Sequence, residues 1–338
     1  MGGHYDTVVI GGGLLGCATA WMISRDGGRV LLAERDQINQ HASGRNAGSL
    51  HFQLEYRMIE RGLEAARKAA EAMPLHLEAA RLWSALPAES GEDIEVRQTG
   101  GLMIAEDARQ VELLEQKTDI ERSWGLDVRV IDRAEIDRIA PYLSGSVIAA
   151  AHCPAEGKAD ARTAAPALAR AALRQGAEIR TRCEVTRLER TAGKWRVTLQ
   201  AGPGAAEIVT ADAVVIAAGV WTTRLGSLMG AHLPTIPLAL TMSVSMRLPK
   251  VMPHLVQHAG GRLSLKQALD GNILIGGGWP ARLPQGRAPK SFAQTIRASA
   301  LNSFSRARLR RKSPWPAANG TPGPAPDPRS LRPVSMKT

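Results

Sequence analysis

The amino-terminal stretch alternates between short apolar runs and glycine-rich or polar breaks. Residues 5–10 form an apolar run that contains Val8 and Val9, and three glycines at positions 11–13 end it. An apolar segment with helical period follows from Leu14 to Arg25, and a second apolar run occupies Arg29 to Ala33. This order predicts a strand, a glycine turn, a helix and a second strand.

Further along the chain, the period of the apolar positions switches several times between helical and alternating. Pro74 is expected to break or kink the first long helix, and Asp107 is expected to cap the next one. The predicted helices cover Glu55–Trp83, Asp107–Trp124, Arg133–Ala140 and Ala161–Gln175. The predicted strands cover Val96–Ala105, Ser146–Cys153, Glu178–Thr181, Glu184–Glu189, Lys194–Leu199, Ala213–Ala217, Leu238–Leu248 and Ile273–Ile275.

The spacing of the first glycines indicates a dinucleotide site. Gly11, Gly13 and Gly16 stand at the G-x-G-x-x-G spacing. The first allows a tight turn, the second lets the backbone approach a pyrophosphate, and the third lets the helix pack closely on the strand. Glu34 ends the second strand, at the position where an acid accepts hydrogen bonds from the ribose hydroxyls of an adenosine.

The layout after Glu34 favours FAD over a nicotinamide cofactor. A polar loop from His41 to Ser49 and a long helix follow, and the parallel sheet resumes only near residue 178, with the buried-type run Val214-Val215-Ile216. The predicted fold is therefore α/β: a Rossmann-type FAD-binding domain (1–50 and 140–225) interrupted by a second, mostly antiparallel-sheet substrate or cap domain (51–139 and 226–290). A nicotinamide dehydrogenase stays open as an alternative.

Composition narrows the classes of partner. The formal net charge is +11, but eight of the 43 basic residues and one of the 32 acidic residues lie from Arg306 onward. Only 4% of residues are aromatic, so we expect no nucleic-acid surface. The apolar runs are too short to span a membrane. Cys17, Cys153 and Cys183 lack the spacing of a metal site and predict free thiols in a reducing cytoplasm, and we expect no metal.

The ordered set of motifs resembles the FAD-dependent amine and D-amino-acid oxidoreductases, a family that includes glycine oxidase, sarcosine oxidase and related dehydrogenase subunits. The resemblance covers roughly residues 5–285. It rests on five segments: residues 6–16 together with Glu34, the Ser43–Ser49 loop, Gly176–Ile179, Val214–Trp221 and Asp270–Gly276.

The resemblance implies where FAD binds. Leu14 and Leu15 would lie over the pyrophosphate, and Glu34 and Arg35 would lie at the adenosine. The other implied contacts are Ala42, Ser43, Ala47, Gly48 and Ser49 along the pyrophosphate, ribityl chain and flavin, the backbone of Val185 at adenine, and the small-residue turn with Ala218, Gly219 and Trp221 behind the cofactor. None of the first-loop residues is a histidine or cysteine at a covalent-attachment position, so the resemblance implies non-covalent FAD.

The chemistry implied is removal of hydride from the carbon next to the amine of a small amino acid or secondary amine, which leaves an imine that water hydrolyses. Oxygen, a quinone or a partner subunit of a dehydrogenase complex would accept the electrons. Arg262 and Lys266 are the candidates for a substrate carboxylate, with Arg45 as a further candidate for the carboxylate or the flavin, and the alternative for Arg262 and Lys266 is a role as solvated strand charges. The catalytic residue is not identified.

The carboxy-terminal part departs from the family pattern. Residues 310–338 contain seven prolines and no apolar period, so we expect residues 291–338 to be an irregular, disordered basic tail. The family closes its site with a strand, an arginine and a glycine-rich turn in this region. We therefore interpret the chain as truncated or frame-shifted, and a catalytically impaired FAD-binding or scaffold subunit stays open as an alternative function.

Overall fold

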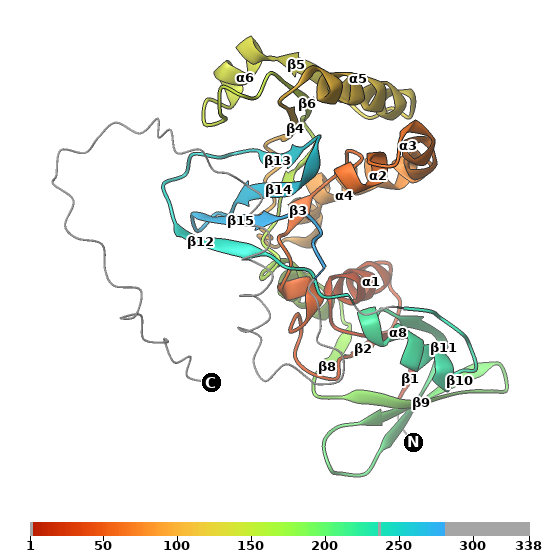
Figure 1. Ribbon diagram of the computed structural model, residues 1–338. Coiled ribbons are helices and arrows are strands. Elements are labelled where there is room, and N and C mark those ends of the chain that lie inside the picture. Colours follow the sequence, from red (N-terminus) through yellow and green to blue (C-terminus); the bar gives the residue numbers. More distant parts are fainter. Residues whose placement is uncertain (1–2, 236–237, 281–338) are drawn as a thin grey trace, which may run out of the picture. The chain divides into compact units, whose positions relative to one another are not determined.

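The computed structural model describes residues 3–235 and 238–280. The helices are α1 (Leu14–Arg25), η1 (Ala42–Gly44), α2 (Tyr56–Ile59), α3 (Leu63–Ala70), α4 (Met73–Ser90), α5 (Ala108–Ser123), α6 (Arg133–Ile139), α7 (Ala164–Arg174), η2 (Gly219–Trp221) and α8 (Thr222–Leu228). The strands are β1 (His4–Ile10), β2 (Val30–Ala33), β3 (Ser49–Leu50), β4 (Gly101–Ala105), β5 (Arg129–Asp132), β6 (Ala149–Cys153), β7 (Gly157–Lys158), β8 (Glu178–Arg180), β9 (Glu184–Thr191), β10 (Lys194–Gln200), β11 (Glu207–Ile216), β12 (Ser243–Arg247), β13 (Leu255–His258), β14 (Gly261–Gln267) and β15 (Asn272–Gly276) (Figure 1).

A six-stranded sheet holds the amino-terminal motif, with the strand order β8-β2-β1-β11-β10-β9. β1 pairs in parallel with both β2 and β11, so that Val8 lies between Leu31 and Val214. β8 adds a parallel strand beside β2, and β10 and β9 extend the other side in antiparallel fashion. The predicted α/β fold with a Rossmann-type sheet is thereby confirmed.

Alternate residues of the central strands pack on opposite faces of this sheet, as the two-residue period of a strand requires. Val9 and Leu32 join Trp21 of α1 and Leu168 of α7 in one apolar cluster. Their neighbours Val8, Ile10 and Leu31 contribute to a second cluster, which also contains Leu225 of α8. Both faces of β1 and β2 are therefore buried, which explains their nearly continuous apolar sequence.

A seven-stranded sheet has the order β12-β15-β14-β13-β4-β6-β5 and is antiparallel except for the pair β13 and β4. β6 corrects one expectation. Its residues fall in the segment 140–225 that was assigned to the FAD-binding part, yet Ala151 pairs with Met103 of β4 and with Val130 of β5. Strand partners far apart in sequence leave no mark in local periodicity. The remaining domain boundaries stay a prediction.

The long helix predicted over residues 55–83 is wrong in detail, because the chain forms α2, α3 and α4 there. Gly62 precedes α3 with φ +97°, a conformation that ends the preceding helix and that side chains rarely adopt. The break expected at Pro74 is present, since α3 ends at Ala70 and α4 begins at Met73, and Pro74 lies in the first turn of α4, where its missing N–H costs nothing. The cap at Asp107 is confirmed, since its carboxylate accepts the N–H of Gln110.

Three further expectations can be compared with the structure. Val214, Val215 and Ile216 are only half-buried, which corrects the expected buried run, and Ile216 lines a cavity. The three cysteines are free and buried, and burial raises the pKa of the Cys17 thiol to about 12. Among the described residues, no helix combines the length and apolar character that a membrane crossing needs. The expected disordered tail, 291–338, lies outside the described residues.

A network of buried charges ties the segment after β3 to α5. The Glu156 carboxylate accepts the N–H groups of Phe52 and Gln53 at 2.7 and 2.9 Å. Lys117 and Glu121, one turn apart on α5, are fully buried and pair at 2.7 Å, and Glu121 also accepts the N–H of Leu54. Because every charge has a partner, the network fixes the path of residues 52–54 without leaving a bare charge in the core.

His254, just before β13, gives the fold a predictable sensitivity to acid. Its ring is buried and shares a hydrogen bond of 2.9 Å with the Tyr142 hydroxyl, and burial, with help from nearby His152, lowers the pKa of His254 to about 4. Between pH 6.5 and 4 the unfolded chain binds a proton that the folded chain does not, so stability should fall as pH falls through this window, by about 3 kcal/mol from this group.

Guanidinium unfolding at pH 7 and at pH 4 measures this effect. The variant His254→Gln, which cannot take up a proton, should lose distinctly less stability between the two values than the unmodified chain does. Equal losses in the two proteins would show that His254 is not held neutral by the fold.

Candidate functional site: a nucleotide cavity

A cavity of about 410 Å³ opens where three parallel strands end. Its wall includes Ile10 and Gly11 at the end of β1, Ala33 and Glu34 at the end of β2, and Ile216 at the end of β11. In open parallel sheets, ligands bind beyond the carboxyl ends of the strands, and a cavity of this volume suits a nucleotide-sized group. The cavity therefore lies where the glycine motif predicted it.

Gly11 and Gly13 of the motif lie too close to neighbouring atoms to carry a side chain. Gly11 has φ +113°, and a Cβ there would meet the carbonyl oxygen of Ala217 at 2.5 Å. A Cβ on Gly13 would lie 2.8 Å from the Ser43 hydroxyl, which accepts the N–H of Leu14 at the start of α1. Helix α1 thus begins at the cavity, and the glycines before it leave no side chains around its first backbone amides. This arrangement binds phosphate groups.

Glu34 is buried at the floor of the cavity and is held by two backbone donors. One carboxylate oxygen accepts the N–H of Gly12 at 2.5 Å, and the other accepts the N–H of Asp36 at 2.7 Å. Each carboxylate oxygen has a second lone pair free to accept a further hydrogen bond. The side chain is therefore fixed in position with acceptor capacity left for ribose hydroxyls.

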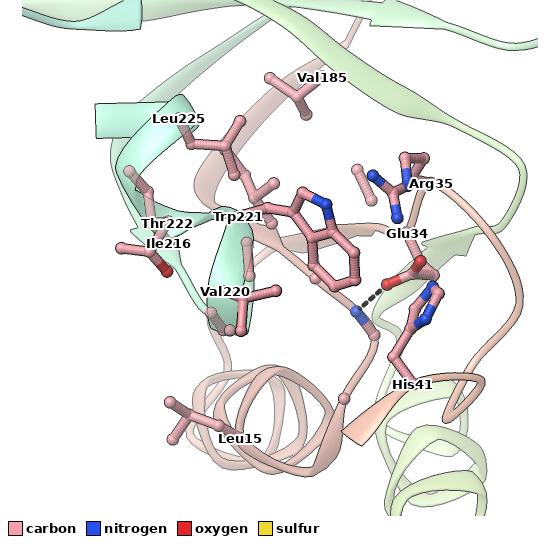
Figure 2. A pocket seen from close by; sticks show the side chains of 18 of the residues that line it. Leu15, Glu34, Arg35, His41, Val185, Ile216, Val220, Trp221, Thr222 and Leu225 are labelled. Atoms are coloured by element: carbon pink, nitrogen blue, oxygen red, sulfur yellow. Dashed lines mark hydrogen bonds between the residues drawn. The ribbon is translucent and has the colours of Figure 1, made fainter. Parts of the chain in front are cut away.

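An aromatic and cationic group forms another wall of the cavity. Figure 2 shows the Trp221 indole beside Arg35 and His41. The Arg35 guanidinium lies 4.3 Å from the centre of the Trp221 ring, and the His41 ring centre lies 4.8 Å from it. Asp36 bonds both His41, at 2.7 Å, and Arg35, at 3.1 Å, and these bonds lower the pKa of Asp36. Such a flat, polar-edged surface suits a planar base.

Most of the predicted cofactor residues come together here, and sequence reasoning missed others. The predicted residues that line the cavity are Gly11, Gly13, Leu15, Glu34, Arg35, Ala42, Ser43, Val185, Ala218, Gly219 and Trp221. The lining residues that were not predicted include Gln37, Asn39, Gln40, His41, Cys183, Glu184, Thr222, Arg224 and Leu225. The helical residues after Trp221 could have been found, because they continue directly from a predicted turn.

The other predicted cofactor residues lie outside this cavity. Gly16 is on α1, where its Cα faces the Gly11 carbonyl, and the Leu14 side chain packs in the apolar core with Trp83 and Leu86. Ala47, Gly48 and Ser49 continue the loop that starts at Ser43, and Ser49 pairs with Lys158 in the short β3–β7 ladder. Of the two leucines expected over the pyrophosphate, only Leu15 presents its side chain to the cavity.

The three candidate substrate cations have different surroundings. Arg262 on β14 forms an ion pair of 2.7 Å with Glu60, and this pairing lowers the pKa of Glu60. Arg45 is exposed and donates to the Gln40 carbonyl oxygen of its own loop at 2.9 Å. Lys266 is buried on β14 and donates to the Ala159 carbonyl oxygen at 3.3 Å. The structure does not bring these three cations together in the nucleotide cavity.

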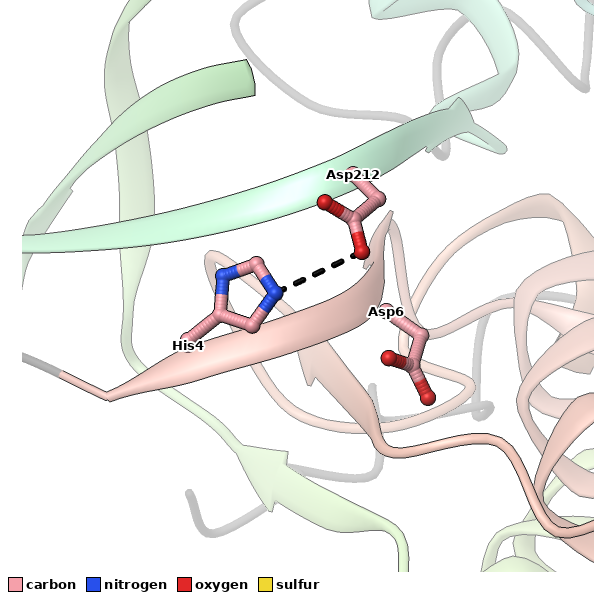
Figure 3. A group of neighbouring side chains, drawn as sticks. All are labelled: His4, Asp6 and Asp212. Carbon is pink, nitrogen blue, oxygen red and sulfur yellow. Dashed lines mark ion pairs between the residues drawn. The ribbon is translucent and has the colours of Figure 1, made fainter.

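Two groups of acidic and histidine side chains lie close enough to share an ion, but their members already have protein partners. In the first, His4, Asp6 and Asp212 (Figure 3), Asp212 pairs with Lys194 at 2.7 Å and Asp6 accepts the Arg29 N–H at 2.7 Å. The second is Glu34, Asp36 and His41 in the cavity, whose hydrogen bonds are described above. We assign a metal to neither group.

The predicted Glu34 role gives a direct expectation for cofactor binding. Glu34→Gln replaces one acceptor oxygen by an NH₂ group, so either the Gly12 or the Asp36 N–H would face another donor. We expect the dissociation constant for FAD to rise roughly 10- to 100-fold, about 1.5–3 kcal/mol. Fluorescence titration of apoprotein measures it. Glu64→Gln, at an exposed position on α3, is the control and should leave the constant unchanged. Equal affinity for FAD in the two variants would show that Glu34 does not contribute to the binding site.

The comparisons with known proteins agree with this site. The family described as DAO, FAD dependent oxidoreductase, matches residues 6–329, which extends beyond the end at residue 285 expected from the motifs. Sarcosine dehydrogenase from Mus musculus is 26% identical over 281 residues, which are 82% of this chain and 29% of that protein. Glycine oxidase from Geobacillus kaustophilus is 28% identical over 239 residues, which are 69% of this chain and 59% of that protein. The crystal structure of glycine oxidase from the same organism superposes with a TM-score of 0.67 at 23% identity, covering 88% of this chain and 78% of that one.

The chain therefore spans less than two thirds of the length of these two curated relatives. The glycine turn, the bare start of α1 and the oriented Glu34 carboxylate fit the adenosine diphosphate half of FAD. The expected cofactor, FAD, is confirmed by the family match, which leaves the nicotinamide alternative without support. The chain belongs to the DAO family of FAD-dependent oxidoreductases.

Proposed function

We propose that the chain binds FAD non-covalently and oxidises a small amino acid or secondary amine at the carbon next to the nitrogen. The observation that supports this most is the Glu34 carboxylate, held by Gly12 and Asp36 beside a glycine turn at the carboxyl ends of β1, β2 and β11. Glycine and sarcosine appear in the names of the two relatives, which favours a small amino acid as the substrate class.

The protein residues have distinct tasks in this proposal. The first amides of α1 and the Ser43 loop hold the pyrophosphate, Glu34 orients the ribose, and Trp221 with Arg35 covers the adenine. FAD, when bound, supplies the hydride acceptor, and the imine that remains on the substrate is hydrolysed by water. The contribution of the chain is then to position the substrate and exclude competing geometries.

Arg262 is our proposed cation for the substrate carboxylate. Its guanidinium can bind a carboxylate in bidentate fashion, and Glu60 occupies that role in the structure at 2.7 Å. Replacing the Glu60 carboxylate by a substrate carboxylate exchanges one ion pair for a similar one, so the exchange costs little. The Arg262–Glu60 ion pair also favours a second candidate function, an FAD-binding scaffold subunit. In such a subunit Glu60 would stay bound to Arg262 and would prevent a substrate carboxylate from binding there.

Anaerobic reduction of the bound flavin tests the proposal. Purified chain loaded with FAD is mixed in the absence of oxygen with glycine, sarcosine, proline and D-amino acids. Glycerol 3-phosphate, which contains no amine, is tested in the same way. We expect the yellow colour to bleach with at least one amino compound and to persist with glycerol 3-phosphate. A chain that retains FAD but bleaches with none of them is a scaffold subunit. Readmission of oxygen or a quinone then identifies the electron acceptor, and a partner subunit is implied if neither restores the colour.

A further inference from the structure

Lys266 on β14 is the buried lysine with the weakest hydrogen bonding among the residues that the structure describes. Only 3% of its surface is exposed, and in the described part of the chain its ammonium makes one hydrogen bond, of 3.3 Å, to the Ala159 carbonyl oxygen. Lys117 pairs with Glu121 at 2.7 Å, and Lys158 donates to the Gln267 carbonyl oxygen at 2.7 Å. Within residues 3–235 and 238–280, no carboxylate forms an ion pair with Lys266. A buried ammonium without an anionic partner is costly.

The charges around Lys266 do not compensate it. Lys158 on β7 has the same sign as Lys266, and Asp160, the acid that favours the charged form of Lys266, is bound by the backbone N–H and side chain of Arg162 at 2.7 and 3.0 Å. Arg162 also pairs with Asp270 at 3.2 Å. Burial, with a contribution from Lys158, lowers the pKa of Lys266 to about 7. An anionic group on a bound molecule would stabilise the charged form.

The loop that leads away from the phosphate end of the cavity brings backbone directly to Lys266. The loop begins at Ser43, which accepts the first amide of α1, and reaches Gly48, which has φ +65°. A Cβ on Gly48 would lie 3.1 Å from the Lys266 Nζ, so no side chain at position 48 separates the ammonium from the loop. The Gly48 carbonyl oxygen accepts the Ala159 N–H at 2.9 Å, which holds the two segments together.

We propose that Lys266 is a positioning residue that presents its positive charge to the flavin end of bound FAD at Gly48, and that it stabilises the flavin forms that carry negative charge. The inference rests on the proposed function. With the adenosine half in the cavity and the pyrophosphate at the start of α1, the rest of the dinucleotide continues beyond the phosphates, in the direction of the Ser43–Gly48 loop. The role requires no substrate, which distinguishes it from the capture of a substrate carboxylate.

The test uses the full chain loaded with FAD and free of substrate. The visible spectrum of the bound oxidised flavin is titrated between pH 5.5 and 9, and its midpoint reduction potential is measured at pH 6 with dithionite. The unmodified chain should show one spectral transition in this range. In Lys266→Met the transition should disappear and the midpoint potential should become more negative. In Lys266→Arg the charge persists at every pH, so the transition should disappear while the potential stays near that of the unmodified chain.

Each result decides the proposal. A pH-invariant spectrum in the unmodified chain contradicts it, even if Lys266→Met fails to fold. An unchanged transition and potential in Lys266→Met also contradict it, and a substrate affinity that falls in that variant would then assign Lys266 to the substrate carboxylate. Failure of the unmodified, folded chain to bind FAD is a separate result, which defeats the proposed function instead.

Discussion

Replacing Gly16 with alanine is expected to abolish retention of FAD and to destabilise the chain by about 4 kcal/mol or more. Alanine is the better helix former by about 1 kcal/mol, so helix propensity alone predicts a gain in stability. The packing predicts the reverse, because a Cβ on Gly16 would overlap the carbonyl oxygen of Gly11. To relieve the overlap, α1 would have to move away from the turn that positions its first amides, and this displacement would disrupt the phosphate-binding site.

Guanidinium unfolding and FAD retention on gel filtration measure the two effects. Gly204→Ala is the matched control, since a Cβ there would meet nothing within 4 Å and its φ is not in the positive range. We expect that control to keep both stability and FAD. A Gly16→Ala protein that is as stable as the control and equally yellow would show that α1 does not need to approach β1 so closely.

The second large effect is expected from Lys117→Met, which should cost about 3–5 kcal/mol of unfolding free energy. The Lys117 and Glu121 side chains are 0% exposed, so removing the ammonium leaves the Glu121 carboxylate uncompensated in the core. Burial already raises the pKa of Glu121. Loss of this pair would also loosen residues 52–54, whose N–H groups bond to Glu156 and Glu121.

Lys68→Met provides the comparison, because Lys68 also pairs with a glutamate on or near its own helix. The Lys68–Glu71 side chains are 78% and 58% exposed, and pairs of this kind contribute less than about 1 kcal/mol. Guanidinium unfolding of the two variants side by side gives the difference. Similar small losses in both would mean that the α5 pair is hydrated in solution.

The parts of this fold that were predictable are those determined by neighbours in sequence. The apolar run around Val8 and Val9, the cap at Asp107 and the glycines at 11, 13 and 16 all act over a few residues, and the structure has the expected strand, helix and turn at each. The position of Glu34 in the cavity followed from the same motif, because strand, turn, helix and strand fix the geometry between them.

The features that sequence reasoning missed depend on distant contacts. β6 joins β4 and β5 because of pairing across long separations, and Lys117 and Glu121 look like solvent-facing charges until residues 52–54 are packed over them. His41 enters the cavity through its contacts with Asp36 and Trp221, and Trp221 is 180 residues further along the chain. Gly62 was overlooked as a helix end because the apolar period continues across it.

Competition between nucleotides shows whether the cavity at the carboxyl ends of β1, β2 and β11 holds the adenosine diphosphate half of FAD. Apoprotein is titrated with FAD in the presence of excess ADP, and separately in the presence of excess FMN. We expect ADP to weaken FAD binding and FMN to have little effect. Folded protein that binds no FAD, or FAD that is displaced by FMN as readily as by ADP, would contradict this expectation.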